Sequence, residues 1–256
     1  MSETLTNNEY KLIASLQNKK FRDSNNLFVI EGEHLIEEYL KSNLPADNIK
    51  YIILRNDYQN DSLTDRLSEF NIHKLNRARF DKLCDTKNPQ GIIAVITGKI
   101  QNQNKDYRFI VALDRINDPG NLGTILRTCY WFGVDSVLIS ENSADIFNPK
   151  TIRSTQGSLF HMNIETNVKL PEKLNALSRN GYNVFVTSLN GETLNTNPKP
   201  GKCVLVFGNE ANGVSSEILS NSNFQQIKIE AYTDCESLNV SVSAGILIRE
   251  FRKALK

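Results

Sequence analysis

NDPGNLGTILRTCYWFG, residues 117–133, is the stretch that most constrains the fold of this chain. It follows the apolar run FIVAL (109–113), opens with a tight group of Asn, Asp, Pro and Gly, and continues as a helical pattern from about Asn121. A strand, a tight turn and a helix in this order are typical of a βα unit, and amide groups at the start of the helix can receive an anion. The alternative is an ordinary tight turn whose helix carries Arg127 on its surface.

Apolar runs and helical patterns alternate on both sides of this unit. Strands are predicted at 27–30, 51–54, 91–97, 109–113, 136–139, 183–187, 203–207 and 226–229. One helical face is predicted from four apolar residues, Leu35, Ile36, Tyr39 and Leu40, and a closing helix is predicted over 240–256. The polar segment 101–107 is predicted to be a linker. We therefore expect a small α/β domain over 1–100 and a larger α/β domain with a mostly parallel sheet over 105–256.

Composition and charge say little about partners. The chain has 256 residues, of which 39% are hydrophobic, and 30 Lys and Arg against 29 Asp and Glu. A net charge of +1 neither requires nor excludes a nucleic-acid partner. RNA contacts are therefore expected from the local basic clusters 19–22 (KKFR) and 74–82 (KLNRARFDK), although such clusters are often ordinary solvated charge.

Cysteine, histidine and hydropathy patterns exclude other classes. The four Cys form no CxxC pair and the three His are scattered, which predicts neither a disulfide framework nor a metal site and favours a cytoplasmic protein. No run approaches the roughly 18 apolar residues of a membrane span, so no membrane partner is expected. The polar N-terminus has no apolar signal core.

A second loop, VFGNEANGVS (206–215), follows another predicted strand. It matches GxxxxG and ends in Ser215, but Val214 stands where a phosphate-binding loop needs Lys. Without that Lys, and with Glu210 to repel a triphosphate, ATP or GTP chemistry is disfavoured. A ligand with hydroxyl groups, or a cation, fits the loop better.

A third loop, ESLNVSVSAGI (236–246), follows the strand predicted at 226–229. Ser237 and Asn239 precede a helix start that is rich in small residues. Helix capping is one explanation for these two side chains. The other is a ligand site, because ligands bind at the carboxyl ends of parallel strands and this is the third polar loop in such a position.

The three loops, together with FNPKTIRSTQGSLFH (147–161), resemble in order and spacing the SpoU/TrmH family of RNA 2′-O-ribose methyltransferases, which belong to the SPOUT class. The stretches LFVIEGEHLIEEYL (27–40) and TKNPQGIIAVI (86–96) resemble the ribosomal-protein-like substrate-binding domain of that family. The resemblance implies a trefoil-knotted methyltransferase fold over 105–256, S-adenosylmethionine as cofactor, an RNA partner and a homodimer with active sites near the subunit interface.

The resemblance also implies site residues. The catalytic centre is expected at Asn121, Arg127, Glu210, Ser237 and Asn239. Cofactor contacts are expected at Thr187, Ser188, Leu189, Phe207, Gly208, Asn209, Gly213, Ile229 and Leu238. No metal is expected, because a sulfonium already provides the electrophile. One departure is that EAYTDC (230–235) lacks the Pro and Gly that family members often carry there.

The chemistry of ribose methylation suggests a role for Arg127. The family mechanism makes this Arg a general base, but a guanidinium rarely gives up its proton. We therefore expect Arg127 to act as an electrostatic clamp on the developing alkoxide or on a nearby phosphate. Ribosomal RNA is the favoured substrate because of the extra N-terminal domain, and transfer RNA stays open. The alternatives are a non-catalytic RNA-binding protein that keeps the fold and a nucleotide-dependent enzyme.

Overall fold

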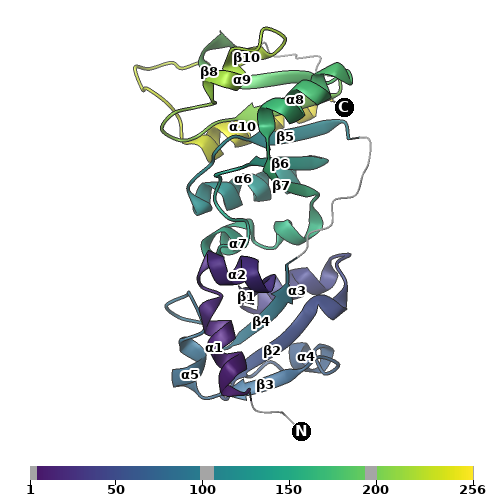
Figure 1. The fold of residues 1–256 in the computed structure, drawn as a ribbon, viewed down its shortest axis with the longest axis vertical. Coiled ribbons are helices and arrows are strands. Elements are labelled where there is room, and N and C mark those ends of the chain that lie inside the picture. The colour runs from purple at the N-terminus through teal and green to yellow at the C-terminus, as the bar shows by residue number, and fades with distance from the viewer. Residues whose placement is uncertain (1–4, 99–106, 194–200, 256) are drawn as a thin grey trace. The chain divides into compact units, whose positions relative to one another are not determined.

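The structure, a computed structural model, describes residues 5–98, 107–193 and 201–255 and divides into two compact units (Figure 1). Unit 1 comprises residues 1–100 and 145–161, and unit 2 comprises 101–144 and 162–256. The segment 145–161 therefore belongs with unit 1 although the sequence-based division placed it in the domain 105–256. Except for Tyr107, the predicted linker 101–107 lies outside the described residues.

Unit 1 is a mixed four-stranded sheet with the strand order β1-β4-β2-β3. Strand β4 pairs antiparallel with both β1 and β2, and β3 pairs parallel with β2. Its strands are β1 (Leu27–Glu31), β2 (Ile49–Arg55), β3 (Ile72–Leu75) and β4 (Ile92–Thr97). Its helices are α1 (Asn7–Ser15), α2 (Lys19–Asn25), α3 (Glu33–Lys41), α4 (Asp61–Arg66), α5 (Arg77–Asp81) and α7 (Pro149–Thr155), with short 3-10 turns η1 (Ala46–Asn48) and η2 (Ser158–His161).

Helix α3 confirms the predicted apolar face, since Leu35, Ile36 and Tyr39 are buried and Leu40 is half-buried. The segment 145–161 packs on the same unit. Phe147 stacks on Phe28 with ring centroids 4.3 Å apart, and Phe160 meets Tyr39 edge-on.

Arg22 corrects one expectation from the sequence. The KKFR cluster was expected to be an RNA-contacting patch, but Arg22 is 4% exposed and forms an ion pair of 2.7 Å with Asp145. Its guanidinium also donates to the carbonyls of Leu16 and Gln17. A buried charge needs such partners, and the bonds to Asp145 fasten the start of segment 145–161 to unit 1.

Unit 2 is a parallel six-stranded sheet with the order β10-β8-β9-β5-β6-β7, as the alternating pattern predicted. Its strands are β5 (Phe109–Leu113), β6 (Ser136–Ser140), β7 (Ile164–Val168), β8 (Asn183–Thr193), β9 (Cys203–Phe207) and β10 (Gln225–Lys228). Its helices are α6 (Pro119–Trp131), α8 (Leu170–Arg179), α9 (Ser216–Leu219) and α10 (Val240–Ala254).

Helices cover both faces of the parallel sheet. Phe109 and Phe185 pack against Phe251 of α10, with ring centroids 6.3 and 4.8 Å away. Ile110 and Val184, the neighbouring residues on the same strands, join a cluster with residues of α8 and α9. Successive side chains of a strand point to opposite faces, so α10 covers one face and α8 and α9 cover the other. Helix α6 packs beside α10.

The eight predicted strands are all present, and two more were not predicted. Strands β3 (IHKL) and β7 (IETNV) are short and mix polar with apolar residues, which hides them in an apolar-run search. Helix α6 begins at Pro119, two residues before the predicted start, because Asp118 is its cap.

Candidate active site

The first turn of α6 places Asn121 beyond the carboxyl end of β5. The carboxylate of Asp118 caps the helix by accepting the Asn121 amide at 2.8 Å. Pro119 follows at the first helical position, where the missing amide hydrogen costs no helical bond. These local preferences fix the turn and leave the side chain of Asn121 for contacts outside its own helix.

The carboxylate of Glu210 joins the first loop to the second. It accepts from Asn121 Nδ2 at 3.0 Å and from the backbone amides of Asn117 and Asp118, both at 3.3 Å. Burial raises the pKa of Glu210, but hydrogen bonds from Asn121 and the backbone amides outweigh it, so the pKa lies below its ordinary value. Glu210 is therefore an anion at neutral pH, held at the positive end of a helix dipole.

Asn239 joins the third loop to the same network. Its Oδ1 accepts the Ser241 amide at 2.8 Å and caps α10, while its Nδ2 donates to Asn121 Oδ1 at 3.1 Å. Of the two explanations that the sequence left open for this loop, capping applies to Asn239, and the same side chain also bonds to the first loop. Asn121, Glu210 and Asn239 are thus brought together from three separate loops.

Loop 208–215 closes tightly on itself. Asn209 and Gly213 exchange two backbone hydrogen bonds of 3.0 and 2.9 Å, and the buried Asn209 side chain accepts two further loop amides at 3.0 Å. Gly208 is required by this closure, since a Cβ there would lie 2.1 Å from the Val214 nitrogen. The loop therefore presents backbone, without a side chain, at Gly208.

Residues 187–191 bulge out of the pairing between β8 and β10. Gln226 pairs with Val186, but the next residue, Ile227, pairs with Glu192. The five residues between those partners are displaced from the ladder. Three of them were predicted to contact the cofactor, and this bulge is what carries them.

Two adjoining cavities lie beside the bulge and the loops that follow β9 and β10, and we call them the paired cavities. Their volumes are about 670 and 500 Å³, within the range of small-molecule sites. Residues common to both linings are Thr187, Ser188, Leu189, Ser237, Leu238 and Ser243. Ile229 lines only the larger cavity, and Phe207, Gly208, Asn209 and Gly213 line only the smaller one. All nine predicted cofactor residues are therefore in the linings.

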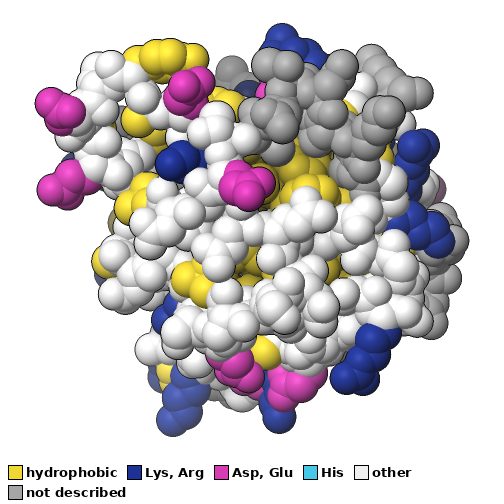
Figure 2. Space-filling view, turned by 90° about the horizontal axis from the view of Figure 1, so that it is seen from above, with side chains coloured by type: hydrophobic (Ala, Val, Ile, Leu, Met, Phe, Trp, Pro, Cys, Tyr) yellow, Lys and Arg dark blue, Asp and Glu magenta, His cyan; other side chains and the backbone are white. Residues whose placement is uncertain are grey.

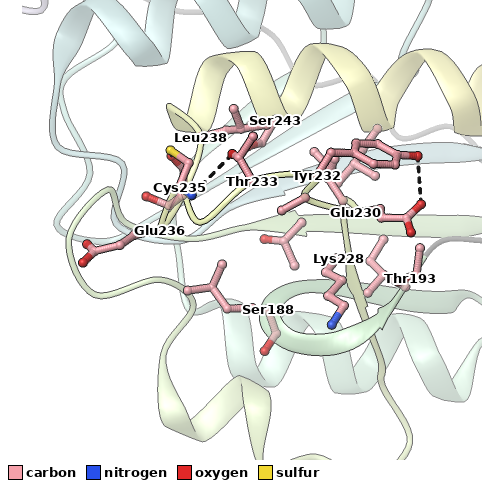
Figure 3. Close-up of a pocket in the computed structure, with 17 residues that line it drawn as sticks. Ser188, Thr193, Lys228, Glu230, Tyr232, Thr233, Cys235, Glu236, Leu238 and Ser243 are labelled. Atoms are coloured by element: carbon pink, nitrogen blue, oxygen red, sulfur yellow. Dashed lines mark hydrogen bonds between the residues drawn. The ribbon is translucent and has the colours of Figure 1, made fainter.

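The larger cavity is shown in Figure 3. Leu238, Cys235 and Ser243 lie toward α10, and Ser188 and Lys228 lie across from them. Figure 2 looks onto the side of unit 2 that carries β8 and β10, where hydrophobic side chains gather in the middle and charged ones lie mostly at the edge. The paired cavities thus combine apolar surface with hydroxyl groups from several elements.

The catalytic residues predicted from the sequence are placed unequally. Glu210, Ser237 and Asn239 line the smaller cavity, and Asn121 contacts two of them. Arg127 lines neither cavity. It lies six residues beyond Asn121 in α6, and at about 100° per residue it points away from the Asn121 side of the helix. Arg127 is exposed, and its side chain forms no ion pair or hydrogen bond with any residue in the described ranges.

Loop 230–239 is exposed along its whole length. Up to residue 238, its side-chain hydrogen bonds within the described part of the chain stay local, such as Tyr232 to Glu230 and the Cys235 amide to Thr233. Tyr232 is 88% exposed. The departure EAYTDC falls in this loop, so the altered segment lies in the wall of the larger cavity.

Asp114 and Arg115 are residues that sequence reasoning missed. The buried Asp114 carboxylate accepts the Ser215 amide at 2.7 Å, and the Arg115 guanidinium donates to Asp114 and to the Gly213 carbonyl. A signal was present, since this charged pair directly follows the wholly apolar strand FIVAL at the edge where ligands bind.

Comparison with known proteins identifies the architecture. The profile of the SpoU rRNA Methylase family matches residues 108–249, more than half of the chain, and that of the MRM3-like substrate binding domain matches residues 7–94. The chain belongs to the SpoU rRNA Methylase family. This membership confirms the prediction of an RNA ribose methyltransferase on an α/β fold and speaks against a nucleotide-dependent enzyme.

Three proteins similar to this SpoU chain match it over nearly their full lengths. The 23S rRNA (guanosine(2553)-2′-O)-methyltransferase RlmP of Bacillus subtilis is 35% identical over 251 residues, covering 98% of each chain. The AdoMet-bound rRNA methyltransferase of Sinorhizobium meliloti is 26% identical with a TM-score of 0.84, covering 99% of this chain and 97% of that one. An RNA 2′-O ribose methyltransferase of known structure is 25% identical with a TM-score of 0.80, covering 98% and 97%.

Two further findings concern metals and membranes. Within the described ranges, no three or more His, Cys, Asp or Glu side chains are grouped so that they could hold a metal ion. In the same ranges, no helix has the length and apolar character needed to cross a membrane.

Proposed function

We propose that this SpoU-family chain transfers a methyl group from S-adenosylmethionine to a ribose 2′-OH of ribosomal RNA in the cytoplasm. The observation that carries the proposal is the network of Asn121, Glu210 and Asn239 at cavities lined by all nine predicted cofactor residues. The Bacillus subtilis relative acts on a guanosine of 23S rRNA, which supports ribosomal over transfer RNA.

The paired cavities fit S-adenosylmethionine in size and chemistry. Leu189, Ile229 and Leu238 offer apolar surface for an adenine ring, and the hydroxyls of Thr187 and Ser188 offer partners for a ribose or an amino-acid group. Gly208 allows the ligand to approach the backbone of loop 208–215 closely. The AdoMet-bound relative from Sinorhizobium meliloti supports this assignment.

The residues of the chain orient the ribose and stabilise charge. When bound, the cofactor supplies a methyl group activated by a sulfonium. As the 2′ oxygen bonds to the methyl carbon, the carbon–sulfur bond breaks and the hydroxyl proton passes to water. Negative charge therefore grows on the oxygen at a place where Asn121 and Asn239 present amide groups. A guanidinium keeps its proton, so Arg127 acts here as an electrostatic clamp and not as a base.

The position of Arg127 supports a homodimer. In its own chain Arg127 does not reach the paired cavities, so a second copy is the source we propose. Exposed apolar residues provide an interface on the packed pair α6 and α10: Tyr130, Trp131, Val242 and Ile246. Trp131 is the most exposed of the four at 82%, and gathered exposed apolar side chains mark interaction surfaces. We also propose the trefoil knot that the family resemblance implies and the division of the chain into domains 1–100 and 105–256.

The main experiment measures methyl transfer and cofactor binding. Calorimetry should detect binding of S-adenosylmethionine or its homocysteine product and no binding of ATP. Labelled methyl groups should enter 23S rRNA from a strain that lacks the gene, and a 2′-deoxy nucleotide at the mapped position should block the reaction. Methylation of transfer RNA alone would replace the substrate, and cofactor binding without transfer to any RNA would favour a non-catalytic role.

Subunit mixing tests Arg127. Arg127→Ala should lower turnover by roughly 10²–10³-fold and leave cofactor affinity unchanged. Mixed with Glu210→Gln subunits, it should recover about a quarter of wild-type activity, since half of the dimers have one intact site of two. No recovery in mixtures that form heterodimers would mean that Arg127 serves its own chain.

A further inference from the structure

Arg115 has a backbone conformation that its residue type disfavours. It follows β5 and Asp114 with a φ of +56°, in the left-handed region that residues with a Cβ seldom adopt. Of the other four non-glycine residues with positive φ in the described ranges, three are Asn, which tolerates this region, and the fourth is Gln156 at the end of α7. Arg115 is therefore kept in this conformation by its surroundings.

The backbone amide, the backbone carbonyl and the guanidinium of Arg115 all form hydrogen bonds with neighbouring residues. Its amide donates to Ser140 Oγ at 2.7 Å, and its carbonyl accepts from Asn209 Nδ2 at 2.8 Å. Its guanidinium donates to both Asp114 carboxylate oxygens at 3.2 Å and to the Gly213 carbonyl at 3.3 Å. One residue thus joins the ends of β5 and β6 to the loop after β9.

These contacts lie on both sides of Glu210 in the sequence. Loop 208–215 is bonded to Arg115 at Asn209 and Gly213, and to the buried Asp114 carboxylate at Ser215. The Arg115 side chain itself is outside the paired cavities and lines a separate cavity of about 420 Å³. Its effect on the site must therefore pass through the loop.

We propose that Arg115 is a positioning residue, which holds loop 208–215 in the conformation that brings the Glu210 carboxylate to Asn121. This inference rests on the proposed function, because it takes Glu210 as part of the active site. A planar guanidinium can bind the Asp114 carboxylate with two donors and still reach Gly213, whereas Lys offers a point charge. Loss of these bonds frees the loop between Gly208 and Ser215.

The first test needs no activity. Arg115→Asn removes the guanidinium and keeps a residue that tolerates positive φ. Hydrogen exchange should become faster in the peptide over 208–215. It should also become faster at the amides of Asn117 and Asp118, which donate hydrogen bonds to Glu210. The matched control is Arg179→Asn, which replaces an exposed Arg at the end of α8 that forms no ion pair within the described ranges, and its exchange should equal that of the wild type.

The second test is kinetic. Arg115→Asn should lower kcat by about 10–100-fold, because displacing a catalytic group by about 1 Å has an effect of that order. Arg115→Lys should fall between this variant and the wild type. In a Glu210→Gln background, Arg115→Asn should change kcat by less than about twofold, since the group that it positions is already lost.

The outcomes separate this inference from the proposed function. A wild type that methylates no RNA overturns the function, and the exchange measurement still decides the role of Arg115. An active wild type whose exchange is unchanged in Arg115→Asn overturns the positioning role, as does a loss of kcat that is equally large in both backgrounds. If Arg115→Asn does not fold, Arg115→Lys is measured by the same exchange and kinetic comparisons.

Discussion

Loop 208–215 lines the smaller of the paired cavities and loop 230–239 lines both, yet the two loops are held very differently. The first is fastened at Asn209, Gly213 and Ser215 and carries the Glu210 network. The second is exposed, and the side-chain bonds of its residues 230–238 reach only two residues along the chain. Fixed geometry is needed where charge develops in a reaction, whereas a wall that only encloses a ligand can order around it. Loop 208–215 therefore has its conformation set before a ligand binds, whereas residues 230–238 of the second loop can order around the ligand.

Gly208→Ala should disrupt loop 208–215, which we call the fastened wall of the cavities. The added Cβ would overlap backbone atoms of Gly213 and Val214, which no side-chain rotation relieves. We expect the free energy of unfolding to fall by about 1–3 kcal/mol or more and methyl transfer to fall by about 100-fold. Chemical denaturation and initial rates measure the two effects. Wild-type stability together with a wild-type rate would show that the loop is not fixed in the way described.

The pH dependence of stability in the variant Asn121→Ala tests the negative charge of Glu210 in loop 208–215. Burial raises the pKa of Glu210 and hydrogen bonds, that of Asn121 foremost, bring it below the ordinary value. A lowered pKa stabilises the fold fully above the unfolded value of about 4.3, and this contribution is lost as pH falls through the folded pKa. The variant should be less stable by about 0.5–1 kcal/mol at pH 7, and the deficit should shrink below about pH 4. Denaturation at a series of pH values measures it, and an equal deficit at pH 3 would contradict the assignment.

Leu238→Ala probes loop 230–239, which we call the exposed wall of the cavities. Leu238 is 49% exposed, so its truncation should change the free energy of unfolding by less than about 0.5 kcal/mol. The affinity for S-adenosylmethionine should fall by about 3–10-fold, because apolar surface that covers the ligand is lost. Calorimetry beside denaturation gives both numbers. A large stability loss with unchanged affinity would reverse the roles of the two walls.

Cys235 reports on the exposed wall without a mutation. Burial raises the pKa of Cys84 and of Cys203 to about 12, and Cys129 is fully buried, whereas Cys235 is exposed in loop 230–239. Iodoacetamide should therefore modify Cys235 first, and S-adenosylmethionine should slow that modification while ATP does not. Mass spectrometry of the native protein follows the reaction. Equal labelling with and without S-adenosylmethionine would place the cofactor away from Cys235.

The sequence pattern predicted the parallel sheet and the convergence of three polar loops for one physical reason, whereas the individual site residues were implied by the resemblance to the SpoU/TrmH family. Apolar runs mark buried strands, and the carboxyl ends of parallel strands meet at one edge, so three polar loops that follow such strands converge. Asn121, Glu210 and Asn239 illustrate this convergence. Strands β3 and β7 escaped because their polar residues interrupt the apolar pattern.

Long-range ion pairs and bonds were beyond prediction. Arg22 resembled a basic surface cluster, but its partner Asp145 lies 123 residues away and withdraws it from solvent. Arg115, whose φ is positive, donates to the carbonyl of Gly213, which lies 98 residues further along the chain. Neither the spacing nor the composition of the sequence contains these pairings. Arg127 was predicted as a catalytic residue, and its position outside the cavity linings depends on the arrangement of α6 in the fold.

Segment 145–161 makes unit 1 discontinuous, so the chain passes between the two units three times. A protease cut between residues 98 and 107 would therefore leave the N-terminal fragment bound through Arg22, Phe28 and Tyr39 to a segment of the other fragment. Genetic exchange of residues 1–100 alone would likewise leave Ile152 and Phe160 without their native neighbours. An exchange of the substrate-binding unit that keeps these contacts therefore has to replace residues 145–161 together with residues 1–100.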